Sequence, residues 1–533
     1  FGLDLINRVD TQICRFGDCA LTNDRLGFKE DNRTNFYTYT LAVGGTATRR
    51  ITDDLESQTS VGVQYYRSIF DANYAYGSTL PPGAQTVTAA ATKTAGESRS
   101  ESRTLGAYVE QRISRNDRLF LTGAVRSDRN SAFGADFKTV FYPKLSASWI
   151  LSDEDFFPTP GWLNQLRLRS AYGASGVQPG TIDAVQYYST TQVLGENGEQ
   201  SGLIFSTLGN ANMKPERSTE VEVGFDATLL GNRVSTEFTY YAKSSRDALI
   251  SRVLPPSLGT GATARLENLG EVSNKGVEAL IDVAVLRLPA VEWTLTLNAS
   301  SNENELVSLG GLPNIVTSST LQQREGYPLW GFWSRRLLGY SDKDGNGIIT
   351  YNADPVRSEI EVSDTAQYSG RSLPKYEAAF TSGLSMWNGQ VRLDALLDYK
   401  GGHLVYNNTE RIRCASRFNC SGLVNPESSL FEQARTVMVR EHPSRSVAGF
   451  LEEGDFLRFR ELALTLTPPS GFAGGVLGGR SLTATLAARN LGVLWTKYTG
   501  VDSEAYGGTG DGGSSFQAFG PPTYYSLRLS VGF

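Results

Sequence analysis

Apolar and polar residues alternate strictly in many segments of this chain, each about ten residues long. Clear examples are residues 37–44, 119–126, 221–229, 277–285 and 525–533. Because successive side chains of a β-strand point to opposite faces, a period of two predicts strands with one apolar and one polar face. We count about sixteen such segments, the first being only a stub at residues 1–6. The pattern predicts an all-β, antiparallel chain.

The connections between these segments alternate between short and long, which distinguishes a membrane barrel from a soluble sandwich. The short ones are 49–54, 113–117, 231–233, 287–290 and the Asn388–Gly389 turn, and the long ones are 68–99, 174–215, 245–273, 304–372, 402–453 and 492–521. Transmembrane β-barrels have short turns at the periplasmic end, long loops outside and an apolar outer band. We therefore predict a transmembrane antiparallel β-barrel in the lipid bilayer. If the last strand ends in the periplasm at Phe533, every long connection lies outside the cell.

Composition supports strands and excludes several functions. The 533 residues include 55 Gly, 25 Phe, 24 Tyr and 7 Trp, which favour strands and turns over helices. No run of 18 apolar residues exists, which excludes a transmembrane helix. The net charge is -6 and the basic residues are scattered, so the sequence lacks the basic patch typical of nucleic-acid-binding proteins. With only 2 His and 4 Cys, a histidine-based catalytic or metal centre is not expected, and we predict that the chain is not an enzyme.

The four cysteines form two close pairs, Cys14 with Cys19 and Cys414 with Cys420. Neither pair has the spacing of a zinc ligand pair, and no histidine completes a zinc set. We predict two local disulfides, since both pairs fall in connections assigned to the oxidising side of the membrane. The chain has no initiating Met and no signal peptide, so it is expected to be processed or a piece of a longer protein.

An ordered set of segments resembles the barrel of SusC/RagA-type TonB-dependent transporters. The set comprises RLFLTGAVRSDRNSAFG (118–134), FYPKLSASWILSDEDFF (141–157), LNQLRLRSAYGASGVQ (163–178), NANMKPERSTEVEVGFD (210–226), NLGEVSNKGVEALID (268–282), GDFLRFRELALTLTPP (454–469) and AARNLGVLWTKYTGVDSEA (487–505). The resemblance implies a barrel of about 22 strands, of which residues 1–533 are the C-terminal portion, with 304–372 as a large extracellular insert. It implies that the N-terminal plug and about six strands are missing or lie on a second chain that completes the barrel.

The resemblance also implies a function and partners. The family imports large nutrients, glycan oligosaccharides or peptides, across the bacterial outer membrane. A SusD-like lipoprotein covers the outer face, and the TonB complex supplies energy through the plug. Two alternatives remain open: a structural outer-membrane anchor that presents large surface loops, and a stand-alone diffusion porin. Pairing of residues 1–6 with the last strand would favour the porin.

One motif predicts a cation site. In DKDGNGIIT (342–350), Asp342, Asp344 and Asn346 occupy positions 1, 3 and 5 of an EF-hand-like loop, and the Ile348 carbonyl is position 7. Alternate oxygen ligands let a short loop wrap calcium, the only cofactor that we predict. Position 12 is Ala353 rather than Glu, and a polar turn is the alternative interpretation.

The other candidates are weaker. Trp330, Trp333, Tyr187 and Tyr188 could stack on sugar rings, or they could pack within loops. Gly508, Gly510 and Gly513 match a dinucleotide-binding spacing, but no strand and helix flank them as such a site requires. His403 and His442 are interpreted as loop histidines without a nucleophile. Seven charged residues are expected to face the polar lumen: Arg167, Arg169, Glu220, Glu222, Asp226, Glu278 and Asp282.

Overall fold

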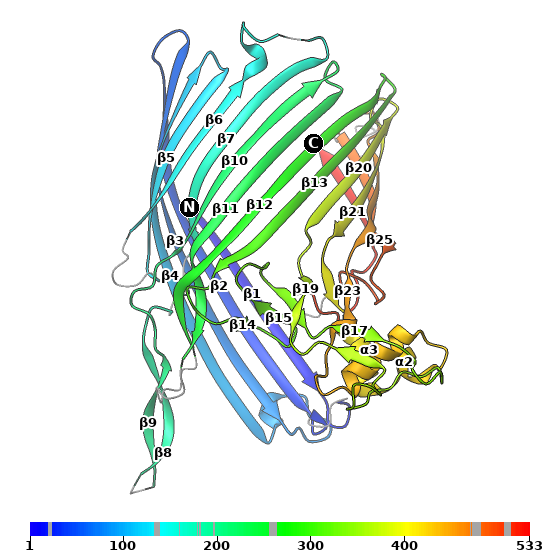
Figure 1. The fold of residues 1–533 in the computed structure, drawn as a ribbon. Helices are drawn as coiled ribbons and strands as arrows, with labels where there is room; N and C mark the ends of the chain where they lie inside the picture. The colour runs from blue at the N-terminus through cyan, green and yellow to red at the C-terminus, as the bar shows by residue number, and fades with distance from the viewer. Residues whose placement is uncertain are drawn as a thin grey trace. The chain divides into compact units, whose positions relative to one another are not determined.

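The computed structural model places sixteen strands in one antiparallel sheet (Figure 1). It describes residues 1–19, 24–132, 139–158, 160–177, 180, 183–195, 198–254, 264–469, 471, 481–505, 513–516 and 518–532. The strand order is β1-β2-β3-β4-β5-β6-β7-β10-β11-β12-β13-β20-β21-β24-β25-β26, so each strand neighbours the next sheet strand in the sequence. The prediction of an all-β antiparallel chain with about sixteen strands is confirmed.

The sheet strands vary widely in length. They are β1 (Gly2–Cys14), β2 (Phe28–Arg50), β3 (Leu55–Ser78), β4 (Thr92–Arg115), β5 (Leu119–Asn130), β6 (Val140–Ile150), β7 (Leu163–Val177), β10 (Glu216–Leu229), β11 (Val234–Val253), β12 (Ala264–Arg287), β13 (Val291–Ser308), β20 (Tyr376–Met386), β21 (Val391–Gly401), β24 (Phe456–Leu466), β25 (Ser481–Thr496) and β26 (Tyr524–Gly532). Phe533 lies outside the described residues.

Three expectations about strand length were wrong. The long connection expected at 245–273 is mostly strand, because β11 continues to Val253 and β12 begins at Ala264. The predicted stub at residues 1–6 is a strand of 13 residues, and Gly2–Cys14 pairs with β2 along its whole length. The long connection expected at 68–99 is mostly strand, because β3 and β4 have 24 residues each and continue pairing to Ser78 and Thr92. These extensions do not continue the alternation, because Ile69 and Phe70 of β3 are adjacent and residues 92–99 of β4 are polar or small. The pattern by which we recognised strands therefore fades before the hydrogen-bonded ladder ends.

The short connections are tight turns, as predicted. Residues 51–54 join β2 to β3, and Gly231 with a positive φ of 65° lies in the turn between β10 and β11. In the turn between β20 and β21, Trp387, Asn388 and Gly389 all have positive φ, the conformation that favours Asn and Gly. We call the edge of the sheet with these turns the short-turn end and the opposite edge the long-loop end.

The long connections contain secondary structure of their own. These elements are β8 (Tyr187–Gly195), β9 (Gly198–Thr207), β14 (Ile315–Val316), β15 (Leu321–Gln323), β16 (Gly331–Ser334), β17 (Leu337–Tyr340), β18 (Ile360–Val362), β19 (Gln367–Arg371), β22 (Leu404–Tyr406), β23 (Leu451–Glu453), α1 (Asn408–Ile412), a π-helix (Arg413–Arg417), α2 (Ser421–Val424) and α3 (Leu430–Arg440), with short 3-10 turns at Val87–Ala89 and Ala448–Phe450. A further 3-10 turn, Leu151–Asp153, lies at the short-turn end, between β6 and β7. The insert expected at 304–372 runs from 309 to 375, because β13 continues to Ser308 and β20 begins at Tyr376. Among the described helices, none has the length and apolar character needed to cross a membrane.

Candidate functional site: a folded module at the long-loop end

Three long connections fold together into one compact body, which we call the loop module. It consists of residues 309–375 between β13 and β20, 402–455 between β21 and β24, and the described part of 497–523 between β25 and β26. Figure 1 shows α2, α3 and β17 of this module beside one another. The sequence predicted these connections as separate loops, whereas the structure packs them against each other.

Two hydrophobic cores hold the loop module together. In the first, Leu321 and Phe332 of the 309–375 connection pack against Tyr406, Val439 and Phe450 of the 402–455 connection, together with Cys414 and Cys420. In the second, Ile349 and Ile360 pack against Ala434, Val437 and Met438 of α3. Each core therefore joins segments about 100 residues apart, which makes the module a tertiary structure rather than two surface loops.

The helix α3 contributes to both cores, with Val439 in the first and Ala434, Val437 and Met438 in the second, and its start follows a recognised capping pattern. Ser429 is the N-cap, and its side chain accepts a hydrogen bond of 3.2 Å from the amide of Glu432. Seven consecutive residues, from Gln433 to Val439, are buried. This helix was not predicted from the sequence, although Ser429 and Glu432 have the spacing of a capping box.

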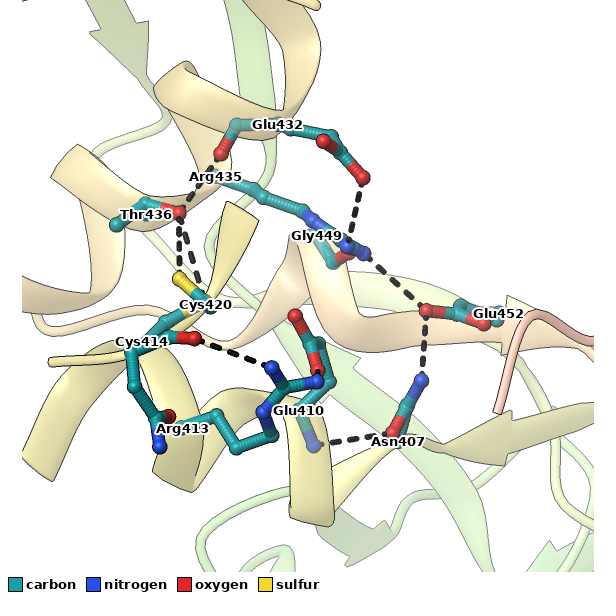
Figure 2. Close-up of a disulfide and its surroundings, with 11 residues drawn as sticks. Asn407, Glu410, Arg413, Cys414, Cys420, Glu432, Arg435, Thr436, Gly449 and Glu452 are labelled. Atoms are coloured by element: carbon teal, nitrogen blue, oxygen red, sulfur yellow. Dashed lines mark hydrogen bonds and ion pairs between the residues drawn. A yellow bond between two sulfur atoms is a disulfide. The ribbon is translucent and has the colours of Figure 1, made fainter. Parts of the chain in front are cut away.

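Both cysteine pairs are disulfides in the structure. Figure 2 shows Cys414 and Cys420 beneath α3, with Thr436 pointing toward them. The Thr436 hydroxyl donates to the Glu432 carbonyl at 2.7 Å and lies 3.5 Å from Cys414 Sγ and 3.6 Å from Cys420 Sγ. Both sulfurs are buried in the first core, so this disulfide is part of the packing of the module.

A buried arginine on α3 joins the helix to β23 (Figure 2). Arg435 Nη1 donates to the Gly449 carbonyl at 3.3 Å and to Glu452 Oε1 at 3.2 Å, and its guanidinium lies 4.9 Å from the Phe450 ring centre. Glu452 Oε1 also accepts from Asn407 Nδ2 at 3.1 Å. The buried charge of Arg435 is thus satisfied by a carboxylate of the same connection.

A second charge cluster anchors the last long connection to the ends of the sheet strands. Arg458 on β24 has a side chain that is 2% exposed, and its Nη2 lies 2.6 and 2.5 Å from the two carboxylate oxygens of Asp502. Its Nε lies 2.9 Å from Glu504. Arg460 bonds to the other Glu504 oxygen at 3.0 Å and pairs with Asp398 on β21. We call these five residues the anchor cluster.

The anchor cluster was not predicted from the sequence, although the sequence contains a signal for it. Arg458 and Arg460 are two residues apart, and Asp502 and Glu504 have the same spacing. Both pairs lie in segments that carry the resemblance, GDFLRFRELALTLTPP and AARNLGVLWTKYTGVDSEA. Matching spacing and opposite charge in two neighbouring segments would have suggested that they meet.

The predicted cation loop is closely wrapped around one carboxylate. Asp342 accepts hydrogen bonds from the amides of Gly345, Asn346 and Gly347 at 2.8, 3.1 and 2.8 Å. The Gly347 amide, followed by those of Gly345 and Asn346, lowers the pKa of Asp342. Asn346 Oδ1 accepts from the Ile348 amide at 2.7 Å, and Asn346 Nδ2 donates to Asp344 at 2.9 Å.

A residue outside the predicted loop joins this site. The Glu359 carboxylate, 3% exposed, has an oxygen within 4.8 Å of carboxylate oxygens of both Asp342 and Asp344. Burial alone would raise its pKa, but hydrogen bonds from the amides of Lys343 and Thr350 and from the Thr350 hydroxyl lower it. Glu359 follows Asp342 by 17 residues, so the spacing of an EF-hand loop could not have predicted it.

The four candidate substrate-binding aromatics occupy different environments. Trp333 is 4% exposed, and its ring packs against Tyr327 and Tyr368 with the Arg324 guanidinium 3.7 Å from its centre. Its faces are therefore covered, and Trp333 is a core residue in this structure. Trp330 is 39% exposed.

The remaining two candidates belong to a hairpin elsewhere in the chain. Tyr187 and Tyr188 lie on β8, which pairs with β9, and both are exposed. The Tyr188 ring lies 4.8 Å from that of Phe205 on β9. Of the four residues, the structure therefore leaves ring surface accessible on Trp330, Tyr187 and Tyr188.

Charged residues line a pocket on the face of the sheet that the alternation predicts to be polar. The pocket, of about 420 Å³, is lined by Arg169, Glu237, Glu278, Glu377 and Asp398 among others. Asp226 lies between Arg167 and Arg169, and Arg169 Nε is 2.8 Å from Asp226 Oδ1. Asp282 accepts from Thr296 at 3.4 Å, while Glu220 and Glu222 lie on β10.

The two histidines are both in the loop module, as expected for loop residues. His403 is buried, burial lowers its pKa, and neither ring nitrogen has a hydrogen-bond partner. His442 Nδ1 lies 2.7 Å from the Ser444 hydroxyl, and burial also lowers its pKa. Gly513 lies next to the bridge of Ser514 with Tyr406, whereas Gly508 and Gly510 lie outside the described residues.

Sixteen consecutive antiparallel strands with alternating apolar and polar faces, tight turns at one end and a folded module at the other define an outer-membrane β-barrel protein. The chain belongs to the TonB dependent receptor-like, beta-barrel family, whose model matches residues 11–410. It is therefore a protein of the bacterial outer membrane, and its fold is the barrel fold of that family.

Known relatives agree with this assignment. TonB-dependent receptor P26 of Formosa agariphila is 27% identical over 467 residues, which are 78% of this chain and 45% of that receptor. TonB-dependent receptor SusC of Bacteroides thetaiotaomicron is 28% identical over 202 residues, covering 37% of this chain and 20% of SusC. This chain thus spans less than half the length of these curated relatives.

Solved structures show the same fold. The structure of the RagAB peptide transporter matches with a TM-score of 0.79 and 19% identity, covering 99% of this chain and 58% of that chain. The RagAB peptide importer in its open-open state matches with a TM-score of 0.78 and 20% identity. The predicted resemblance to SusC/RagA-type transporters is confirmed.

Proposed function

We propose that this chain forms the C-terminal barrel wall of a TonB-dependent importer of large nutrients, either glycan oligosaccharides or peptides. The observation that carries the proposal is membership of the TonB dependent receptor-like family over residues 11–410. A charged wall such as the one formed by Arg167, Arg169 and Asp226 supports it, because a hydrated solute needs polar groups along its path. The proposal assigns no catalytic step to the chain.

The same proposal names three partners. A SusD-like lipoprotein would cover the long-loop end, where the loop module offers a folded surface rather than mobile loops. The TonB complex would act through a plug domain, and a second chain or a further segment would supply the plug and the remaining strands. These partners are those that the SusC-like relatives imply.

Uptake in living cells tests the proposal. A strain deleted for this protein is supplied with fluorescent oligosaccharides or peptides of graded length, with and without an intact TonB complex. We expect uptake of one of the two classes to require both the protein and TonB. Uptake that is unchanged in the deletion strain would contradict an import role.

The loop module favours one alternative function, a structural outer-membrane anchor that presents surface loops. Its two cores and its buried disulfide stabilise an exposed structure independently of any solute. In that case deletion would alter cell-surface assembly and leave uptake of both classes intact. A stand-alone porin would instead show TonB-independent conductance in planar bilayers.

We also propose that the loop module binds calcium through Asp342, Asp344, Asn346 and the Ile348 carbonyl, with Glu359 replacing the missing acidic residue at position 12. Three carboxylates converge here, and calcium prefers six to eight oxygen ligands. Lowered pKa values keep Asp342 and Glu359 ionised at neutral pH. A cation would relieve the repulsion between these charges and hold the 309–375 connection in one shape.

Calorimetric titration of the whole protein with CaCl₂ tests the calcium proposal. We expect a dissociation constant of roughly 10⁻⁴–10⁻³ M, the range of extracellular calcium modules. Asp344→Ala and Glu359→Gln should each weaken binding about tenfold or more, because each removes a carboxylate ligand. Asp364→Asn, in the same connection but outside the cluster, is the matched control. Equal calcium binding by all variants would refute the assignment.

A further inference from the structure

A group of arginines gathers on one face of the sheet where its apolar band ends. Arg67 on β3 lies directly opposite Arg103 on β4 in the strand register, and Tyr39 on β2 lies opposite Arg67. Arg129 on β5 lies opposite Leu105, one row nearer the short-turn end. Because positions two apart share a face, Arg67, Arg103 and Arg129 all point to the same side of the sheet.

This side of the sheet is the one expected to face lipid. Moving from these arginines toward the short-turn end, it carries exposed apolar side chains on all four strands, including Leu41, Val43, Val61, Val63, Leu105, Val109, Ile113, Leu121 and Val125. The opposite face of the same strands carries residues such as Glu110 and Arg112. Tyr39 and Tyr65 stand among the arginines, as aromatic residues do at a membrane–water interface. The arginines therefore lie at the level of lipid headgroups on the long-loop side.

The positive charge of this group is only partly compensated. Glu101 accepts from Arg67 Nε at 2.8 Å and Nη2 at 3.1 Å, and from Arg103 Nε at 2.6 Å. One carboxylate thus serves two guanidinium groups that stand directly opposite each other, so one of their two positive charges stays uncompensated. Arg129 is exposed and has no charged partner among the residues that the structure describes.

We propose that Arg67, Arg103 and Arg129 bind the phosphate groups of a phosphorylated glycolipid in the outer leaflet of the outer membrane. Guanidinium groups bind phosphate through paired hydrogen bonds, and three of them within neighbouring rows can contact one headgroup. The apolar residues below them would contact the acyl chains. The inference depends on the membrane location and on the long-loop end facing outward, and it is independent of which solute the protein transports.

Lipid titration of the whole protein, purified from outer membranes in detergent, tests this inference. Native mass spectrometry counts bound lipid while bisphosphorylated lipid A is added. The variant Arg103→Gln/Arg129→Gln removes two positive charges and leaves the Arg67–Glu101 pair intact. At about 1 kcal/mol for each arginine near a membrane surface, we expect lipid A binding to weaken about 30-fold. Arg112→Gln on the other face of β4 is the matched control and should bind as the wild type does.

Titration with other ligands tests whether the bound phosphate belongs to a glycolipid. Dephosphorylated lipid A should bind weakly, with the same affinity for the wild type and for the double variant, because the substituted arginines are proposed to bind only its phosphate groups. Inorganic phosphate or phosphatidylglycerol that displaces lipid A at equal concentration would overturn the assignment to a glycolipid. Unchanged lipid A affinity in the double variant, with heat-modifiable gel mobility showing that it is folded, would overturn the site itself.

Discussion

Removing Asp502 from the anchor cluster should release the last long connection from the barrel strands. Arg458 is 2% exposed, and Asp502 supplies two of its short contacts. Truncating one partner of a buried ion pair costs about 3–5 kcal/mol, because the other charge stays buried without compensation. Glu504 keeps a contact with Arg458 but is shared with Arg460, so it cannot fully replace Asp502.

Amide hydrogen exchange measures this loss locally. The amide of Glu504 donates to Asp502, and that of Ala505 donates to the Asp502 carbonyl. When opening and closing are fast, exchange of these amides reports the free energy of local opening. Asp502→Ala should therefore speed exchange in residues 497–505 by about 140-fold to 3700-fold, since each 1.4 kcal/mol is a factor of ten.

Two companion variants make the interpretation specific. Asp502→Asn keeps the shape and removes the charge, and should cost about 1.5–3 kcal/mol, the value of a hydrogen bond to a charged group. Arg392→Gln breaks the exposed pair with Asp394 and should change exchange little, because exposed ion pairs contribute at most about 1 kcal/mol. Wild-type exchange rates in Asp502→Ala would refute the conclusion that this cluster holds the connection.

Further predictions concern the loop module. Replacing Cys414 and Cys420 by Ala removes a disulfide with a sequence separation of 6, and the loop-entropy model predicts a loss of about 2 kcal/mol in the stability of the module. Limited proteolysis in urea measures this loss. The barrel should keep its heat-modifiable gel mobility. Burial lowers the pKa of His403; the Asp455 charge opposes this shift and the Lys400 charge adds to it. As the pH falls, His403 is therefore protonated in the unfolded module before it is protonated in the folded one. The module should lose stability as the pH falls below about 6.5. His403→Gln should flatten this pH dependence of the melting temperature, and His442→Gln should remove a smaller part. Trp333→Ala should cost about 3–5 kcal/mol of module stability and Trp330→Ala less than about 1 kcal/mol, and equal losses would contradict their different burial.

The strands could be predicted from the sequence because their determinants are local. A period of two follows from strand geometry, and a tight turn such as Asn388–Gly389 needs residues that accept positive φ. The ends of β3 and β4 were not predictable in this way. Beyond the apolar band, both faces carry polar residues, and only hydrogen bonding to the neighbouring strand shows that the ladder continues.

The candidate site likewise contains residues that the sequence predicts and residues that only the fold brings together. The loop of Asp342, Asp344 and Asn346 is visible in the sequence because its geometry is set within six residues. Glu359 approaches these residues only because the 309–375 connection folds back on itself. Trp330 and Trp333 are three residues apart and indistinguishable by type, yet the ring of Trp333 is covered by Tyr327, Tyr368 and Arg324.

The β-sheet, its turns, the membrane environment and the spacing of one cation loop follow from the sequence, because these depend on residues close together in the chain. Only the folded structure shows that the 309–375 and 402–455 connections share two cores and that Arg458 on β24 meets Asp502 beyond β25. Such contacts join residues tens to more than a hundred positions apart. Their free energy depends on burial and on satisfied charge in the assembled module, which no local pattern of residues encodes.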